Sequence, residues 1–257
     1  MLENNHPKNQ SLAAPELSVV ILCYCLEKEI FNFVEKVKVD FKNNDINNYE
    51  LILVANFLEN SYDPTHEYAK QIVQKNNNIK CVCREKKGMM GWDMKSGLEK
   101  ASGKFIAVID GDGQMPIKDL VRVYKKIKNN NFDLVKTYRL ARGDGIWRKT
   151  ISIIYNLIFT AFFYGLKAKD INSKPKIFTR DFYNKLNLKS DDWFIDAEIM
   201  INARRLKTKI AEMPTEFLGL CGKRKSFVRL PAIFEFIKNL ILFRIREFKI
   251  INNTRKK

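Results

Sequence analysis

Short apolar runs alternate with helix-like stretches along the first half of the chain. Five runs have the length and β-branched content of buried strands, and the stretches between them read as helices. The predicted strands are 17–24, 50–55, 79–83, 104–109 and 132–137, and the predicted helices are 27–41, 64–75, 92–101 and 117–127. Strict alternation of this kind favours an α/β fold in which helices cover a mostly parallel sheet.

The predicted strand at 104–109 runs into D-G-D-G-Q at residues 110–114, and this stretch predicts a functional site. Ligands of open α/β sheets bind beyond the carboxyl ends of the strands. Side chains two positions apart on an extended segment point the same way, so Asp110, Asp112 and Gln114 present oxygens to one side. Such hard ligands suit Mg²⁺ or Mn²⁺, which are often shared with substrate phosphates. The alternative is a simple turn, which would account for Asp110-Gly111 but not for Asp112 or Gln114.

Two basic clusters offer cations for a phosphate-bearing ligand. The first is T-Y-R-L-A-R-G-D-G-I-W-R-K at 137–149, and the second is G-K-R-K-S at 222–226. Arginine binds phosphate oxygens through forked N–H donors. Either cluster taken alone is equally typical of a solvated face.

The chain carries a formal charge of +17, although its 46% apolar and 29% charged residues are ordinary for a globular protein. Residues 223–257 hold 11 Lys and Arg against 2 Glu, which is over half of the net charge. A basic surface can face nucleic acid, anionic lipid or an anionic substrate. We find no helix-turn-helix, RNA-binding aromatic motif or zinc pattern, so nucleic acid is not the expected partner.

Two apolar segments indicate possible contact with a membrane. Residues 150–166 form a run of 17 without a charge, somewhat shorter than the ~20 of a spanning helix. We expect a buried or membrane-facing helix there. Residues 231–249 mix Phe, Ile and Leu with Lys and Arg, which is typical of a helix lying in a membrane interface. An amphipathic helix packed on the domain would show a similar pattern.

The five cysteines give no metal or redox signature. Four form C-x-C pairs inside apolar runs, a spacing that differs from C-x-x-C motifs. They are Cys23, Cys25, Cys81 and Cys83, with Cys221 alone. We expect buried, reduced thiols and a cytoplasmic location. Residues 1–16 are polar, lack the apolar core of a signal peptide, and are expected to be a disordered lead-in.

Seven fragments in a fixed order resemble the family-2 glycosyltransferases, which have the GT-A fold. They are L-S-V-V-I, L-I-L-V-A-N, R-E-K-K-G-M-M-G-W-D-M-K-S-G-L-E-K-A-S-G, I-D-G-D-G-Q-M-P, T-Y-R…W-R-K, D-I-N-S-K-P-K-I-F and G-K-R-K-S. The order is most similar to the polyprenyl-phosphate branch that includes dolichol-phosphate mannose synthase. The resemblance covers residues 17–230. It implies a nucleotide-sugar half at 17–115 and an acceptor half at 116–230, followed by a basic amphipathic helix and tail at 231–257.

The resemblance also implies roles for single residues. Asp110, Asp112 and Gln114 match a metal-binding D-x-D-x-Q, and Asp110 is the carboxylate best placed to guide the acceptor. Asp196 and Glu198 are the next candidates for a catalytic base. The residues that match phosphate contacts are Arg139, Arg148, Ser152, Arg224 and Ser226.

Two places depart from the family pattern, and a third position has two possible roles. Asn56 lies where family members commonly carry adjacent aspartates that read the nucleotide, so Asn56 is the expected donor contact. Lys174-Pro175 replaces the Gly-Phe that often follows the D-x-x-S element. Asp170 begins that element and is expected either on the acceptor side or as a turn cap.

The function implied is inverting transfer of a hexose from a nucleotide-diphosphate sugar, with Mg²⁺ or Mn²⁺, to a polyprenyl phosphate. The enzyme would be cytoplasmic and peripheral at the inner face of the membrane, held on anionic lipid by its basic helix. One alternative is a saccharide acceptor in surface polysaccharide or lipopolysaccharide assembly, which would require a base. A second alternative is a basic binding module without catalysis.

Overall fold

The computed structural model of the protein describes residues 14–142, 157–159, 162–163, 168–218 and 230–254. The strands are β1 (Leu17–Leu22), β2 (Tyr49–Val54), β3 (Ile79–Val82), β4 (Phe105–Asp110), β5 (Leu134–Arg142), β6 (Lys176–Thr179) and β7 (Ile210–Phe217). The helices are α1 (Glu29–Lys42), α2 (Thr65–Gln74), α3 (Met90–Leu98), α4 (Ile117–Lys128), α6 (Arg180–Asn184), α7 (Ile195–Arg205) and α8 (Leu230–Thr254). The predicted α/β class is confirmed.

The strands form one sheet in the order β3-β2-β1-β4-β6-β5-β7. β6 is antiparallel to both of its neighbours, β4 and β5, and the other pairings are parallel. The sheet is therefore mostly parallel, as predicted. Because β6 runs against β4, the start of β6 lies at the same edge as the end of β4, and this brings Lys176 into register with Val108.

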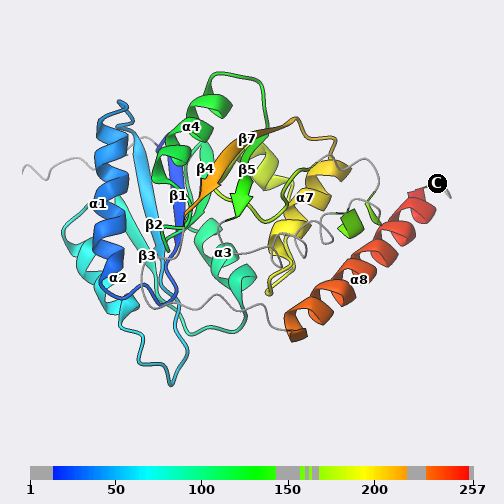
Figure 1. The fold of residues 1–257 in the computed structure, drawn as a ribbon, viewed down its shortest axis with the longest axis horizontal. Helices are drawn as coiled ribbons and strands as arrows, with labels where there is room; N and C mark the ends of the chain where they lie inside the picture. The colour runs from blue at the N-terminus through cyan, green and yellow to red at the C-terminus, as the bar shows by residue number, and fades with distance from the viewer. Residues whose placement is uncertain (1–13, 143–156, 160–161, 164–167, 219–229, 255–257) are drawn as a thin grey trace, which may run out of the picture.

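Alternate side chains of β1 enter two cores on opposite faces of the sheet. Leu17, Val19 and Ile21 pack in the core beneath α1, α2 and α4, whereas Val20 and Leu22 pack in the core that includes α3, α7 and α8. A strand buried on both faces has no polar alternation, and this explains its continuous apolar sequence. Figure 1 shows α1 and α2 at one end of the molecule and α8 at the other.

The elements that the alternation did not predict lie in the second half of the sheet. β6 has only four residues, and β7 contains Pro214 and two glutamates, so neither has a strong apolar pattern. β5 continues to Arg142, with a register shift between Arg139 and Ala141.

The helix predicted at 150–166 is described only in part. Phe159 and Phe163 are fully buried, whereas Leu157 is 65% exposed. No described helix combines the length and apolar character needed to cross a membrane.

Helix α8 is anchored on the body of the protein by one of its faces. Leu240 is fully buried, and the Phe243 ring lies 5.0 Å from that of Phe194, the residue before α7. Glu247 is buried and pairs with Arg204 of α7, with Arg204 NH1 2.6 Å from Oε1. Another side of the helix carries exposed apolar residues: Ile237, Ile241, Leu242, Ile245 and Phe248. We call these five residues the outer stripe of α8.

Four cysteines fall within the described residues, and all four are free thiols. Cys23 is buried, but Cys25, Cys81 and Cys83 are half-buried. The expectation of buried thiols therefore holds fully for Cys23 alone among these four. Cys221 lies outside the described residues.

Candidate functional site

The loop at 110–114 begins at the carboxyl edge of the parallel strands. Asp110 ends β4 opposite Leu22, and the Gly111 N–H donates to Leu22 O at 2.9 Å. A Cβ on Gly111 would lie 2.6 Å from Leu26 Cδ1 and 3.2 Å from Leu22 O, so a larger residue here would require the Leu26 side chain to shift. Gly113 has φ +73°, a left-handed conformation that glycine adopts without strain. Both glycines thus shape this turn.

The oxygen donors of the loop fit a hard divalent cation. Asp110, Asp112 and Gln114 are all half-buried, and Asp112 Oδ1 accepts from the Gln114 N–H at 3.1 Å. Gln114 O accepts from the Leu218 N–H at 2.9 Å, which ties the loop to the end of β7. No group of three His, Cys, Asp or Glu suited to a metal occurs among the described residues. A cation here would take further oxygens from a ligand, as Mg²⁺ commonly does with substrate phosphates.

Lys174 brings a buried ammonium group against this loop. Its Nζ lies 3.2 Å from Asp110 Oδ2, 3.1 Å from Asp196 Oδ2 and 3.4 Å from Met90 Sδ. Only 3% of its side chain is exposed. The antiparallel start of β6 places Lys174 beside the end of β4, and the Thr137 hydroxyl donates to Lys174 O at 2.7 Å.

Asp196 of α7 lies beneath Lys174 and is fully buried. Its Oδ1 accepts from Lys176 Nζ, and its Oδ2 faces Lys174 Nζ without a well-aligned hydrogen bond. Both carboxylate oxygens therefore face ammonium groups. This placement favours a positioning role for Asp196 over the base role expected from the sequence.

Burial and neighbouring charges oppose each other in this cluster. Burial raises the pKa of Asp196, but Lys174 and Lys176 outweigh it and the pKa is lowered. Burial lowers the pKa of Lys174, yet Asp110 and Asp196 more than offset it and the pKa is raised. For Lys176, burial is the larger effect and lowers the pKa to about 7, although the neighbouring Asp196 raises it. Asp196 is therefore ionised, and Lys174 is its charged partner on the side of the loop.

Arg139 of β5 pairs with Asp170 through two hydrogen bonds. Arg139 Nε donates to Oδ2 at 2.6 Å, and NH2 donates to Oδ1 at 2.9 Å. Each side chain is 10% exposed. Lys136 Nζ donates to Asp170 O and lies 3.1 Å from Glu212 Oε1. The pair orders the segment that leads to Lys174, and the phosphate contact of Arg139 stays a prediction.

Asn56 lies in a polar network where β2 ends. It is 1% exposed, and its Nδ2 donates to Asp93 Oδ1 at 2.9 Å and to Ser96 Oγ at 3.0 Å. Its Oδ1 accepts from the Arg84 N–H at 2.9 Å, and Lys86 Nζ pairs with Asp93. Asn56 therefore joins β2, β3 and α3, and its contact with a nucleotide stays a prediction.

Of the remaining predicted positions, the structure describes Glu198. Glu198 is buried, and its carboxylate accepts the backbone N–H groups of Lys189 and Ser190, the closest at 2.8 Å. Arg148, Ser152, Arg224 and Ser226 lie outside the described residues.

Sequence reasoning missed three members of the site. In the sequence, Lys174 stood out only because it replaces a residue of the family pattern. Lys176 follows two positions later, and both side chains therefore point toward Asp196. Asp93 stood in a predicted helix with no signal that it would meet Asn56. A charge inside a strand that must be buried is the signal that could have found Lys176.

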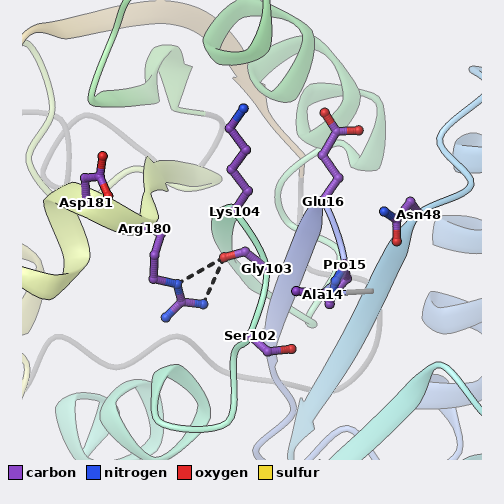
Figure 2. A pocket seen from close by; sticks show the side chains of 9 residues that line it. All are labelled: Ala14, Pro15, Glu16, Asn48, Ser102, Gly103, Lys104, Arg180 and Asp181. Atoms are coloured by element: carbon purple, nitrogen blue, oxygen red, sulfur yellow. Dashed lines mark hydrogen bonds between the residues drawn. The ribbon is translucent and has the colours of Figure 1, made fainter. Parts of the chain in front are cut away.

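A separate cavity of about 540 Å³ opens at the opposite edge of the sheet, before β1, β2 and β4 begin. Figure 2 shows Arg180 beside Gly103, and its guanidinium donates to Gly103 O at 2.9 Å and to Ala101 O at 2.8 Å. This arginine joins two segments of backbone. Because ligands of such sheets bind at the carboxyl edge, the site is the 110–114 loop.

The model of the family described as "Glycosyl transferase family 2" matches residues 18–195. The chain belongs to this family. It is therefore a glycosyltransferase, and the resemblance found in its sequence is confirmed. The match includes the 110–114 loop, Lys174 and Lys176, and it ends beside Asp196.

Two curated relatives are similar over much of the chain. A dolichyl-phosphate beta-glucosyltransferase of Dictyostelium discoideum is 24% identical over an aligned length of 263, and the match covers 96% of this chain and 78% of the relative. A dodecaprenyl-phosphate galacturonate synthase of Rhizobium johnstonii is 26% identical over 182 residues, which is 70% of this chain and 52% of the relative.

A solved structure shares the fold. Glucosyl-3-phosphoglycerate synthase from Mycobacterium tuberculosis, in complex with Mn²⁺, uridine diphosphate and phosphoglyceric acid, superimposes with a TM-score of 0.66. It is 17% identical, and the match covers 90% of this chain and 79% of that one. The same enzyme in complex with Mg²⁺ and uridine diphosphate has a TM-score of 0.65. The predicted GT-A fold is confirmed.

Proposed function

We propose that this glycosyltransferase moves a hexose from a nucleotide-diphosphate sugar to a polyprenyl phosphate, with inversion, using Mg²⁺ or Mn²⁺. The observation that carries the proposal is the 110–114 loop at the carboxyl edge of a GT-A sheet. Relatives whose names contain dolichyl phosphate and dodecaprenyl phosphate support the acceptor. One enzyme with the same fold, crystallised with uridine diphosphate and either Mn²⁺ or Mg²⁺, supports the donor.

Asp110, Asp112 and Gln114 would hold the metal. When bound, the metal stabilises negative charge on the departing nucleoside diphosphate. Gly111 and Gly113 bring the backbone close to the donor, while Arg148, Arg224 and Ser226 remain proposed phosphate contacts. Arg139 and Ser152 complete that set.

The state of the two candidate bases favours a phosphate acceptor over a saccharide. A sugar hydroxyl needs a base, whereas a phosphate is already ionised. Asp196 faces two ammonium groups, and Glu198 binds backbone N–H groups, so both are engaged within the protein. A phosphate acceptor makes no demand on either carboxylate.

The outer stripe of α8 supports peripheral attachment of the protein to the inner face of an anionic membrane. Its apolar residues are exposed beside Lys238 and Arg246, a combination typical of helices at lipid interfaces. Each basic residue near anionic lipid contributes about 1 kcal/mol. Attachment there would bring the enzyme to a lipid-linked acceptor.

Calorimetric titration with UDP-glucose and GDP-mannose tests the donor half of the proposal. We expect one donor to bind only with Mn²⁺, and Asp112→Ala to abolish that binding. Asp181→Ala, an exposed aspartate at the opposite edge, is the control. If a wide donor panel failed while anionic vesicles still bound, the binding-only alternative would replace the enzyme.

A further inference from the structure

Lys174 places an ammonium group directly against the first aspartate of the metal-binding loop. Its Nζ lies 3.2 Å from Asp110 Oδ2 and 3.1 Å from Asp196 Oδ2. The Thr137 hydroxyl fixes its backbone carbonyl at 2.7 Å, and Met90 Sδ lies 3.4 Å from Nζ. Since the side chain is 3% exposed, the ammonium is held in place by the fold.

An ammonium at this position opposes a divalent cation in two ways. It occupies one oxygen of Asp110, and it repels a second positive charge that approaches the same carboxylate. Repulsion is strong where protein excludes water, because the effective dielectric constant is far below that of bulk water. Lys176 and Asp196 are both fully buried beneath it, whereas the Asp110 side chain is 33% exposed, so water is excluded on the Lys174 side of this contact and reaches its loop side.

We propose that Lys174 is a positioning residue that competes with the divalent cation for Asp110 and so sets the metal affinity of the site. The inference rests on the proposed function, in which Asp110 and Asp112 hold the metal. The loop alone then binds metal weakly, and binding becomes tight when the diphosphate of the donor adds its oxygens. Lys174 thereby couples metal loading to binding of the nucleotide sugar.

Titration of Mn²⁺, with free Mn²⁺ followed by electron paramagnetic resonance, tests the coupling. The full chain is compared with Lys174→Gln and Lys174→Arg, each with and without uridine diphosphate. We expect Lys174→Gln to bind Mn²⁺ on the order of tenfold more tightly without the nucleotide, because the repelling charge is gone. Lys174→Arg keeps the charge and stays near the wild type. Lys38→Gln removes a charge from α1 and is the control for net charge.

A double variant tests whether Lys174 acts on metal affinity through Asp110 or through the overall charge of the site. In an Asp110→Asn background, Lys174→Gln changes Mn²⁺ affinity little, because the group through which Lys174 acts is gone. Should Lys174→Gln fail to fold, Lys174→Gly removes the same ammonium and leaves the Asp196–Lys176 pair in place.

Three results would contradict the inference. Equal Mn²⁺ affinity in the wild type and Lys174→Gln overturns it and leaves the proposed function standing. A tenfold gain that persists in the Asp110→Asn background shows that Lys174 does not act through Asp110. Absence of Mn²⁺ binding to the wild type, with and without uridine diphosphate, overturns both the inference and the metal site.

Discussion

Arg139 and Asp170 form a two-pronged ion pair, with Arg139 Nε 2.6 Å from Oδ2 and NH2 2.9 Å from Oδ1. The pair joins β5 to the segment that leads into β6. Lys174 lies in this segment, and Lys176 is the first residue of β6. Sequence reasoning had placed Arg139 on a substrate phosphate and Asp170 either near the acceptor or at a turn. Their pairing makes the shape of the 170–176 segment depend on both residues.

Asp170→Asn leaves the Arg139 guanidinium without its counter-charge. Removing one partner of a largely buried ion pair costs about 3 kcal/mol, so we expect a loss of that size in the free energy of unfolding. Urea denaturation measures it, with the exposed Asp181→Asn as the matched control. A loss no larger than that of the control would show that the pair does not stabilise the fold.

Gly113→Ala tests the turn of the metal-binding loop. Alanine at φ +73° costs about 1 kcal/mol from backbone strain alone, since a Cβ there would meet no atom within 4 Å. Asparagine tolerates the left-handed region, so Gly113→Asn should lose less stability. Thermal unfolding of the two variants checks this order. Equal stability of all three proteins would contradict the left-handed turn.

Glu50 should make stability depend on pH. The carboxylate accepts from Ser18 and Ser102 and pairs with Lys80 Nζ at 2.6 Å. Burial raises its pKa, but Lys80 and the serines outweigh it, so the folded pKa lies below the ordinary glutamate value of 4.5. A lowered carboxyl pKa stabilises the fold above that value, and the contribution is lost as pH falls through the folded pKa.

Urea denaturation of the wild type and Glu50→Gln measures this contribution at several pH values. We expect the variant to be less stable by about 1–3 kcal/mol near neutral pH. The difference should shrink as the buffer falls below the pKa of the unfolded carboxyl group. A difference that stays constant with pH would contradict ionisation of Glu50 as its origin.

The outer stripe of α8 should bind lipid without supporting the fold. Ile241 and Ile245 are 44% and 46% exposed, so Ile241→Asp with Ile245→Asp should leave the melting temperature unchanged. The same double variant should lose at least about tenfold in binding to anionic vesicles, because apolar insertion is lost. Vesicle co-sedimentation measures the binding.

Val39→Asp is the matched control for the stripe, since Val39 is 53% exposed on α1 at the other end of the molecule. Leu240→Asp provides the opposite comparison, because its fully buried side chain should be required for the fold. Vesicle binding that survives the double variant of the stripe would contradict membrane attachment through α8.

The parallel half of the fold was predictable because each of its strands and helices is indicated by a pattern within its own residues. Each of β1 to β4 is a short apolar run, and the helices between them carry their own periodicity. β6 was not predictable in this way, since Lys176 is a charge inside a central strand. Only the distant Asp196 makes that charge tolerable, and no pattern within the strand reports it.

The site was predictable where its residues are neighbours in the chain. Asp110, Asp112 and Gln114 share one loop, so their spacing alone indicated a common direction. Lys174 reaches Asp110 only because an antiparallel strand returns beside β4. That contact depends on tertiary structure and could not be read from spacing.

Transfer of radiolabelled sugar to lipid tests the central claim most directly. The full chain is incubated with Mn²⁺, a labelled nucleotide sugar that binds it, and either polyprenyl phosphate or a soluble saccharide acceptor. We predict that label enters the organic phase only with polyprenyl phosphate and Mn²⁺, and that Asp112→Ala abolishes this transfer while Asp181→Ala does not. Label found in the saccharide and absent from the lipid would contradict the proposed acceptor.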